Sequence, residues 1–129
     1  MLIKTKIVVV DDNEDLLGII VEFLNNYNLN VIGLNGITHI RQITELSPDL
    51  VILDLEMHTL NGNQILKMMR NIPEYENIPV IIMTALKEKA TEDTLKLAQD
   101  LFVKPFILND LLNRILYLTQ MLPESSGRS

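Results

Sequence analysis

Carboxylates, a hydroxyl and an ammonium group follow directly after short apolar runs in this sequence. The side chains concerned are those of Asp11, Asp12, Asp54, Thr84 and Lys104. Burying a carboxylate without partners is costly. An acid such as Asp54, at the end of an apolar run, is therefore either a turn residue facing water or one member of a charged site. Which of these holds depends on where the surrounding elements place the five groups.

The apolar runs predict strands that are covered on both faces. Residues 7–10, 50–53 and 80–83 are continuous apolar stretches rather than alternating ones, which is typical of buried parallel strands. Two weaker runs, residues 31–34 and 101–103, predict further strands nearer the edges of the sheet.

Helical spacing of apolar residues lies between these runs. It predicts five helices, around residues 16–27, 37–46, 65–69, 95–97 and 108–122. Strands that alternate with helices in this way predict an α/β fold. We expect a three-layer α/β/α domain with a doubly wound, five-stranded parallel sheet and right-handed crossovers.

In such a sheet, ligands bind at the carboxyl ends of the strands. Four of the five predicted strands place a polar side chain at that end. Taken singly, Asp12 or Asn13 reads as a helix cap, Asp11 as a turn acid, Thr84 as a strand residue and Lys104 as a solvent-exposed cation. Their joint occurrence at one sheet edge favours a functional site instead.

The charges of these side chains predict a bound cation. Three carboxylates, from Asp11, Asp12 and Asp54, stand against the single ammonium of Lys104. Two like charges ~4 Å apart repel by ~4 kcal/mol at an effective dielectric near 20, so the acids must take up protons or bind a cation. A hard divalent ion, Mg²⁺ or Mn²⁺, suits carboxylate ligands. Thr84 and Lys104 could then stabilise an incoming phosphoryl group.

Composition narrows the classes of protein. The chain has 129 residues, of which 47% are hydrophobic and 22% charged, enough for one domain with a real core. The absence of Cys excludes disulfides and thiolate sites. A net charge of −6 without a basic stripe argues against direct nucleic-acid binding. No apolar run approaches the ~20 residues of a membrane span. We expect a soluble, cytoplasmic protein with one domain over residues 1–122 and a disordered tail over residues 123–129.

Four segments together resemble a known family. "VVVDDN", "VILDLEMHTLNG", "IIMTA" and "VKPF" are similar, in this order, to the four signatures of the receiver domain of two-component response regulators. The resemblance runs from residue 4 to about residue 122. It implies a flavodoxin-like fold with strand order 2-1-3-4-5, an order that we take from the family and not from the spacing.

The resemblance also implies roles for individual residues. Asp54 would be the phosphoacceptor, receiving a phosphoryl group from a histidine of a sensor histidine kinase or a phosphotransfer protein. Asp12 and Asp54 would bind Mg²⁺ directly, together with the backbone carbonyl of Glu56, whereas Asp11 would act mainly through water.

Two further residues complete the implied site. The Thr84 hydroxyl would move toward the phosphate, and the Lys104 ammonium would pair with a phosphate oxygen. The Lys104–Pro105 peptide would be cis, which is uncommon enough to indicate a specific need.

The implied function is a phosphorylation-activated switch, not an enzyme, that assists its own phosphorylation and dephosphorylation. Its output would pass by protein–protein contact to a downstream target or a missing output domain. A homodimer through the fourth and fifth helices is possible. Two alternatives stay open: an interaction domain that works without phosphorylation, and a Mg²⁺-dependent aspartyl-phosphate phosphatase. Asp54-Leu55-Glu56 lacks the acid pattern of the haloacid-dehalogenase phosphatases.

The chain departs from the family pattern at several positions. His58 stands where the family usually has Pro. Leu101 replaces the usual switch aromatic, and Phe102, one residue on, should face the other side of the sheet. Glu56 and Leu86 occupy places that tune dephosphorylation in the family. Because Leu86 cannot orient a water molecule, we expect a long-lived phosphorylated form.

Overall fold

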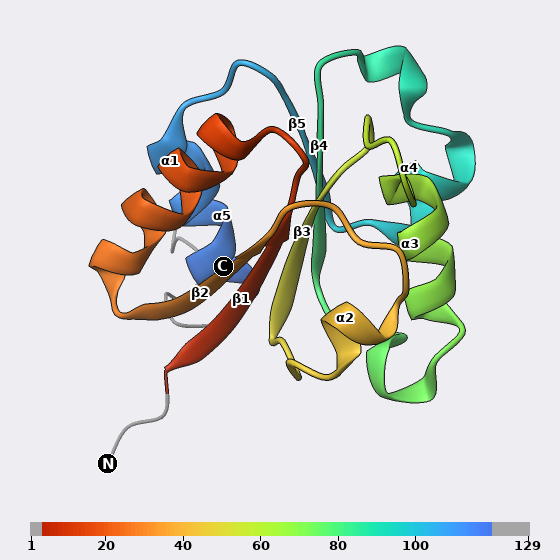
Figure 1. Cartoon of the computed structure of the whole chain (residues 1–129), viewed down its shortest axis with the longest axis horizontal. Helices are drawn as coiled ribbons and strands as arrows, with labels where there is room; N and C mark the ends of the chain where they lie inside the picture. Colours follow the sequence, from red (N-terminus) through yellow and green to blue (C-terminus); the bar gives the residue numbers. More distant parts are fainter. Residues whose placement is uncertain (1–3, 120–129) are drawn as a thin grey trace, which may run out of the picture.

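A five-stranded parallel sheet lies between two layers of helices in the computed structural model, which describes residues 4–119 (Figure 1). The strand order is β2-β1-β3-β4-β5, which confirms the predicted doubly wound sheet and places the two weaker strands at its edges. The strands are β1 (Thr5–Val10), β2 (Leu29–Leu34), β3 (Leu50–Asp54), β4 (Val80–Thr84) and β5 (Asp100–Val103).

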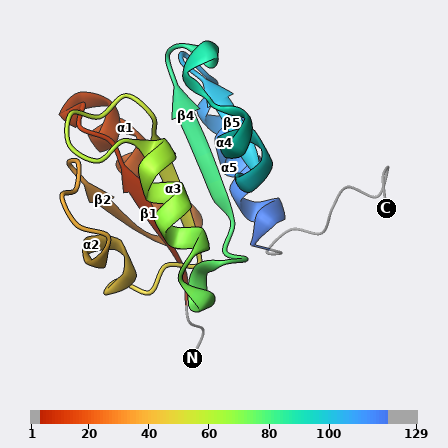
Figure 2. The same cartoon turned by 90° about the vertical axis from the view of Figure 1, so that its right-hand side faces the viewer.

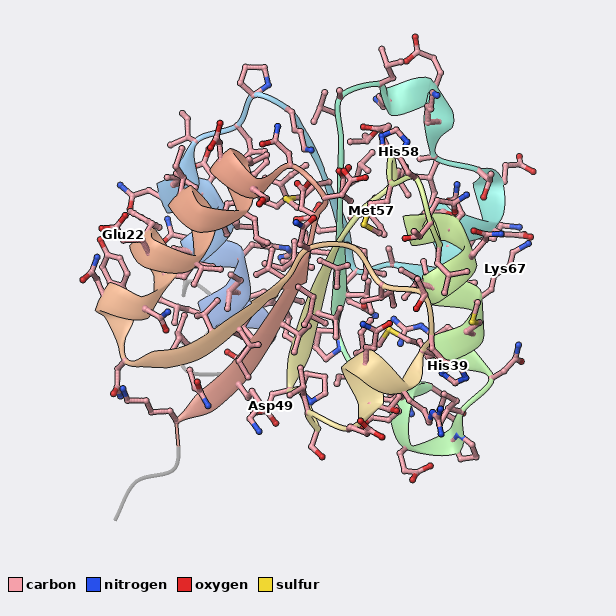
Figure 3. All side chains as sticks on the ribbon, viewed as in Figure 1. Glu22, His39, Asp49, Met57, His58 and Lys67 are labelled. Carbon is pink, nitrogen blue, oxygen red and sulfur yellow. The ribbon has the colours of Figure 1, made fainter. Side chains whose placement is uncertain are left out.

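Helices cover both faces of this sheet. In order along the chain they are α1 (Glu14–Leu24), α2 (Arg41–Thr44), α3 (Gly62–Arg70), α4 (Glu92–Leu97) and α5 (Leu108–Leu118). α1 and α5 lie on one face, and α2, α3 and α4 on the other (Figures 1 and 2). Their outer surfaces carry charged side chains such as Glu22 and Lys67 (Figure 3). Within residues 4–119, no helix has the length and hydrophobicity needed to cross a bilayer.

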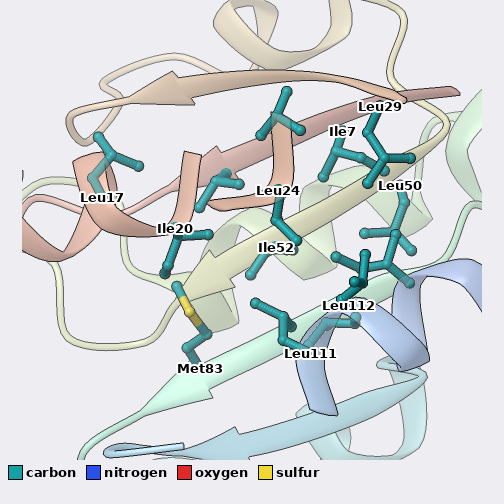
Figure 4. Packing of buried hydrophobic residues seen from close by; sticks show 14 residues of the cluster. Ile7, Leu17, Ile20, Leu24, Leu29, Leu50, Ile52, Met83, Leu111 and Leu112 are labelled. Atoms are coloured by element: carbon teal, nitrogen blue, oxygen red, sulfur yellow. The ribbon is translucent and has the colours of Figure 1, made fainter. Parts of the chain in front are cut away.

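The core is divided into two clusters by the sheet. Successive residues of β1 alternate between them: Ile7 and Val9 pack under α1 and α5, and Val8 and Val10 pack under the helices of the other face. Figure 4 shows the first cluster. Every residue of β3 and β4 is buried. Helices cover both faces of the sheet, so every side chain of these strands is buried, and their sequences are continuously apolar rather than alternating.

Side-chain caps fix where α1 and α3 begin. The Asn13 side chain accepts a hydrogen bond from the Leu16 N–H at the start of α1. Asn61 and Gln64 form a reciprocal capping box at the start of α3. Because Asn13 rather than Asp12 caps α1, the Asp12 carboxylate is available to the end of the sheet.

The second helix is shorter than its apolar spacing predicts. The side chain of Ile43 is fully buried, as expected, but α2 holds only Arg41–Thr44. Before it, the Gln42 side chain accepts hydrogen bonds from the backbone N–H groups of Thr38 and His39, which stabilises a turn instead of helix. After it, Ser47 adopts a left-handed φ of 50° that ends the helical path.

The other element boundaries differ by a few residues. α1 ends at Leu24, and a 3₁₀ turn, Asn25–Tyr27, replaces the rest of the predicted first helix. Asn28, with a φ of 61°, then turns the chain into β2. Residues 120–122 of the predicted fifth helix and the predicted tail over residues 123–129 lie outside the described residues.

Candidate functional site

Polar side chains from four strands meet at the carboxyl edge of the sheet. Asp54 and Thr84 are the last residues of β3 and β4, and Asp11 and Lys104 directly follow β1 and β5. The registers of β1 with β3 and of β3 with β4 set Asp11 beside Asp54, and Thr84 one residue beyond it. The Lys104 N–H donates to the Thr84 carbonyl at 2.8 Å, which extends the pairing of β4 and β5 to the lysine. The sheet thus holds these side chains on neighbouring strands.

An ammonium group bridges two buried acids at this edge. Lys104 Nζ lies 3.2 Å from Asp11 Oδ2 and 3.2 Å from Asp54 Oδ2. The side chains of Asp11 and Asp54 are 0% and 3% exposed, whereas that of Lys104 is 19% exposed. The lysine therefore reaches from the surface into a buried pair of like charges.

A third acid completes a set of oxygen ligands. One carboxylate oxygen each from Asp11, Asp12 and Asp54 lies within 4.8 Å of the others. Asp12 is half-buried, and its Oδ2 accepts the His58 N–H at 3.1 Å. The Glu56 N–H donates to Asp54 Oδ1 at 3.2 Å. Three hard oxygen donors with an excess of negative charge fit a divalent cation such as Mg²⁺. The Glu56 carbonyl stays a predicted ligand.

The surroundings shift the pKa values of both Asp54 and Lys104. Burial raises the pKa of Asp54 to about 6, and the Asp11 carboxylate adds to this effect, while Lys104 opposes it. Burial on its own would lower the pKa of Lys104, but the Asp11 and Asp54 carboxylates outweigh it, and the net shift is upward. Lys104 consequently stays a cation, and a metal ion at this site would compete with a proton for Asp54.

A contact of the Glu56 side chain was missed by sequence reasoning. The Thr84 hydroxyl donates to Glu56 Oε2, and the Ala85 N–H donates to Glu56 Oε1 at 2.8 Å. Thr84 is fully buried. Ala85 belongs to the quoted segment "IIMTA", but a main-chain donor leaves no signal in the residue type. Because the Thr84 hydroxyl and the Ala85 N–H both donate to a carboxylate, they form a pair of donors that suits an anion.

The residues around the site follow several sequence-based expectations. The Lys104–Pro105 peptide is cis, as predicted. Leu101 packs on the α3 and α4 side of the sheet, and Phe102 packs on the opposite side, which confirms the expected alternation. His58 is exposed. Figure 3 places it, with Met57, at the end of the molecule where the strands finish and Asp49 at the opposite end.

Comparisons with known proteins agree on one family. A family model described as the response regulator receiver domain matches residues 7–116. The chain is 31% identical over 123 residues to hybrid signal transduction histidine kinase D of Dictyostelium discoideum, covering 92% of the chain and 8% of that protein. It is 37% identical over 109 residues to protein-glutamate methylesterase/protein-glutamine glutaminase 1 of Syntrophomonas wolfei, covering 79% of the chain and 30% of that protein. The chain thus spans less than a third of the length of either relative.

Solved structures share the fold. A response regulator receiver domain protein from Clostridium thermocellum is 28% identical, with a TM-score of 0.78 over 91% of this chain and 95% of that one. The chemotaxis protein CheY4 of Vibrio cholerae is 22% identical, with a TM-score of 0.80, and the match covers 90% of this chain and 99% of that one. The response regulator protein TrrA of Thermotoga maritima is 23% identical, with a TM-score of 0.74, and the match covers 88% of this chain and 98% of that one. Its structure was solved in complex with Mg²⁺ and BeF.

Proposed function

The chain belongs to the response regulator receiver domain family, and on that premise we propose that Asp54 accepts a phosphoryl group from a phosphohistidine. The donor would be a sensor histidine kinase or a phosphotransfer protein. One observation carries the proposal above all others: Lys104 Nζ lies 3.2 Å from both Asp11 and Asp54, at the strand ends that also hold Asp12 and Thr84.

The chemistry needs no further protein group to activate the acid. An Asp54 carboxylate oxygen attacks phosphorus, and a P–O bond forms as the P–N bond to the donor histidine breaks. The imidazole nitrogen keeps the electron pair and takes up a proton from water. A carboxylate is already a nucleophile and needs no general base. Phosphoryl transfer asks mainly for positioning and charge stabilisation, which Lys104 supplies by pairing with a phosphoryl oxygen.

The acidic set is the proposed metal site. Asp11, Asp12, Asp54 and the Glu56 carbonyl would hold Mg²⁺ or Mn²⁺, with Asp11 acting mainly through water. When bound, such an ion neutralises charge on the phosphoryl oxygens. The closeness of the three carboxylates supports this assignment, and so does the Mg²⁺ and BeF complex of the similar TrrA of Thermotoga maritima.

Phosphorylation would work as a population shift. An acyl phosphate replaces a singly charged carboxylate with a group of roughly −2 charge. The added charge favours the conformation in which Thr84 and Lys104 both contact it. The change would then pass by protein contact to a downstream target or an output domain, with a dimer through α4 and α5 as one possible form.

Labelling with a small acyl phosphate tests the proposal. With acetyl phosphate and Mg²⁺, the protein should take up one phosphoryl group per chain, and Asp54→Asn should abolish this labelling. Asp49→Asn is the matched control, because Asp49 is exposed and lies at the opposite end of the molecule (Figure 3). Labelling that survives Asp54→Asn would refute the assignment. Multiple turnover of a phosphomonoester would favour the phosphatase alternative instead.

A further inference from the structure

A carboxylate of the chain itself occupies two anion donors beside Asp54. The Thr84 hydroxyl and the Ala85 N–H both donate to Glu56, through Oε2 and Oε1 respectively. Glu56 follows β3, whereas Thr84 ends β4 and Ala85 follows it. The side chain therefore bridges the ends of two neighbouring strands. We call the three residues Glu56, Thr84 and Ala85 the carboxylate latch.

The latch lies directly against the proposed phosphoacceptor. Thr84 is one residue beyond the position that pairs with Asp54 across β3 and β4. The main chain of Glu56 also touches Asp54, because its N–H donates to Asp54 Oδ1 at 3.2 Å. A phosphoryl group on Asp54 would bring three acceptor oxygens to this corner. Those oxygens need the same kind of donors that the Glu56 carboxylate already uses.

We propose that the Glu56 carboxylate stands in for the phosphoryl group in the unmodified protein and is displaced from Thr84 and Ala85 when Asp54 is phosphorylated. The proposal rests on the function proposed above and adds a regulatory step to it. The step exchanges one hydrogen-bond acceptor for another and makes or breaks no covalent bond. The Glu56 side chain acts on the site through its contacts with Thr84 and Ala85, and in this step Glu56 is a positioning residue.

Charge and space both permit the exchange. Two anions cannot share one pair of donors without strong repulsion at short range, so the carboxylate must leave as the phosphoryl group arrives. Glu56 is half-buried and lines a pocket of about 340 Å³ together with His58, Asn63 and Lys89. This pocket gives the displaced side chain space outside the pair of donors.

The latch sets a threshold for switching. When the donors are occupied in most molecules, the apparent affinity for a phosphoryl group falls in proportion to the fraction of molecules with free donors. Loss of the latch should therefore tighten the binding of a phosphoryl mimic. Because hydrogen bonds to a charged group are strong, we expect the affinity for the mimic to rise by about tenfold or more when the latch is lost.

The affinity for beryllofluoride, measured in excess Mg²⁺ by calorimetry, tests the latch. Glu56→Ala should bind the mimic about tenfold more tightly than wild type. Glu56→Asp keeps the charge but is one methylene shorter, so it should lose the latch and also bind more tightly. Glu88→Ala, which removes an exposed acid from the 3₁₀ helix Lys87–Lys89, is the control and should bind as wild type does.

A second measurement observes the latch without any phosphoryl mimic. In NMR spectra recorded without Mg²⁺, the Ala85 amide resonance should move in the direction of a weaker hydrogen bond in Glu56→Ala and Glu56→Asp, and stay in place in Glu88→Ala. Wild-type affinity for beryllofluoride in both Glu56 variants would overturn the proposal. Wild-type affinity in Glu56→Asp alone would overturn it in favour of simple charge repulsion.

The two proposals fail in different ways. If the wild-type protein does not bind beryllofluoride with Mg²⁺, the proposed function is contradicted, whereas the Ala85 resonance still shows whether Glu56 holds the donor. If the wild type binds the mimic and the Ala85 resonance is unaffected by Glu56→Ala, the latch is refuted and the proposed function stands.

Discussion

Asp54 is a buried acid whose proton is held more tightly in the folded protein than in the unfolded chain. Burial, reinforced by the Asp11 carboxylate, raises its pKa from 3.8 to about 6. A raised pKa stabilises the fold while the acid is protonated, fully so below the unfolded value. That stability is lost as the pH rises through the folded value. Without divalent ions, ionised Asp54 is therefore a burden to the fold at neutral pH.

The variant Asp54→Asn should remove this burden. In the absence of divalent ions at about pH 7.5, its free energy of unfolding should exceed that of wild type by roughly 1–3 kcal/mol. At about pH 4, Asp54 is protonated in the folded protein and only about half ionised in the unfolded chain, so most of the difference should be lost there. Urea denaturation at the two pH values measures both quantities. A difference that does not change with pH would contradict the explanation.

Single residues differ in how far the sequence could place them. Asp54, Thr84 and Lys104 could be placed at one edge because strand ends and parallel pairing follow from the apolar runs. The contact of the Glu56 carboxylate could not be predicted, because it depends on a side-chain rotamer and on a backbone N–H donor. Every non-proline residue carries such a donor, so the residue type at position 85 gives no signal. The roles of all these residues stay predictions.

At the scale of elements, the start of α3 passes very close to the end of β3. A Cβ atom placed on Gly62 would lie 2.8 Å from the Asp54 carbonyl oxygen and 2.9 Å from Leu55 Cδ2. Such approaches are shorter than van der Waals contact, and one of them is to main chain. Gly62 therefore allows α3 to pack against the strand that carries the phosphoacceptor.

Replacement of this glycine should be costly. Gly62→Ala should lower the free energy of unfolding by about 1–3 kcal/mol, because the extra methyl group overpacks the junction. Gly18→Ala is the matched control: it lies in the exposed part of α1 with no atom within 4 Å of the added Cβ. That change should stabilise the protein by up to about 1 kcal/mol through helix propensity. Equal effects of the two substitutions in urea denaturation would refute the packing argument.

A half-buried arginine, Arg70, joins α3 to α4 and to the chain before β4. The Arg70 guanidinium donates to the carbonyl oxygens of Leu97, Tyr75 and Ile78, and to the Gln99 side chain, at 2.8–3.1 Å. Burial lowers the pKa of Arg70. The arginine thus satisfies main-chain acceptors where α4 ends and β5 approaches, and fixes the short helix at its C-terminus.

Loss of this arginine should loosen α4. Arg70→Ala leaves three partly buried carbonyl groups without this donor and should cost about 2–4 kcal/mol of unfolding free energy. Arg41→Ala changes an exposed arginine in α2 and should stay within about 0.5 kcal/mol of wild type. Hydrogen exchange should also become faster at the Val80 amide, which donates to the Gln99 side chain at 2.7 Å. Equal stabilities of the two variants would contradict this role.

Elements could be predicted from the sequence in type and order better than in length. Apolar spacing over residues 37–46 identified Ile37 and Ile43 as core residues, yet only Arg41–Thr44 is helical. The turn that shortens this helix depends on the Gln42 side chain, and polar side chains of this kind carry no periodic signal. Two partners of Arg70, Leu97 and Gln99, lie 27 and 29 residues away along the chain, and no sequence pattern predicts these contacts.

At the scale of the whole molecule, folding gathers charges that lie far apart in the sequence. The chain carries a net charge of −6, and three of its carboxylates come within 4.8 Å of one another at one edge of the sheet. Lys104 offsets part of the cost of bringing them together, and at a pH below about 6 a proton on Asp54 offsets more of it. A cation that binds only the folded arrangement would offset the remainder, so metal binding and global stability are linked.

Mg²⁺ should accordingly stabilise the whole fold. At about 100 times its Kd, Mg²⁺ should raise the free energy of unfolding by about 2.7 kcal/mol at neutral pH. The gain should fall as the pH drops through about 6, the pKa of Asp54, because protons then compete with the metal. Asp12→Asn should reduce the gain by weakening the site. Thermal unfolding with NaCl at matched ionic strength separates specific binding from screening. An equal gain with NaCl, or in Asp12→Asn, would mean that the acidic edge screens charge without binding a metal ion.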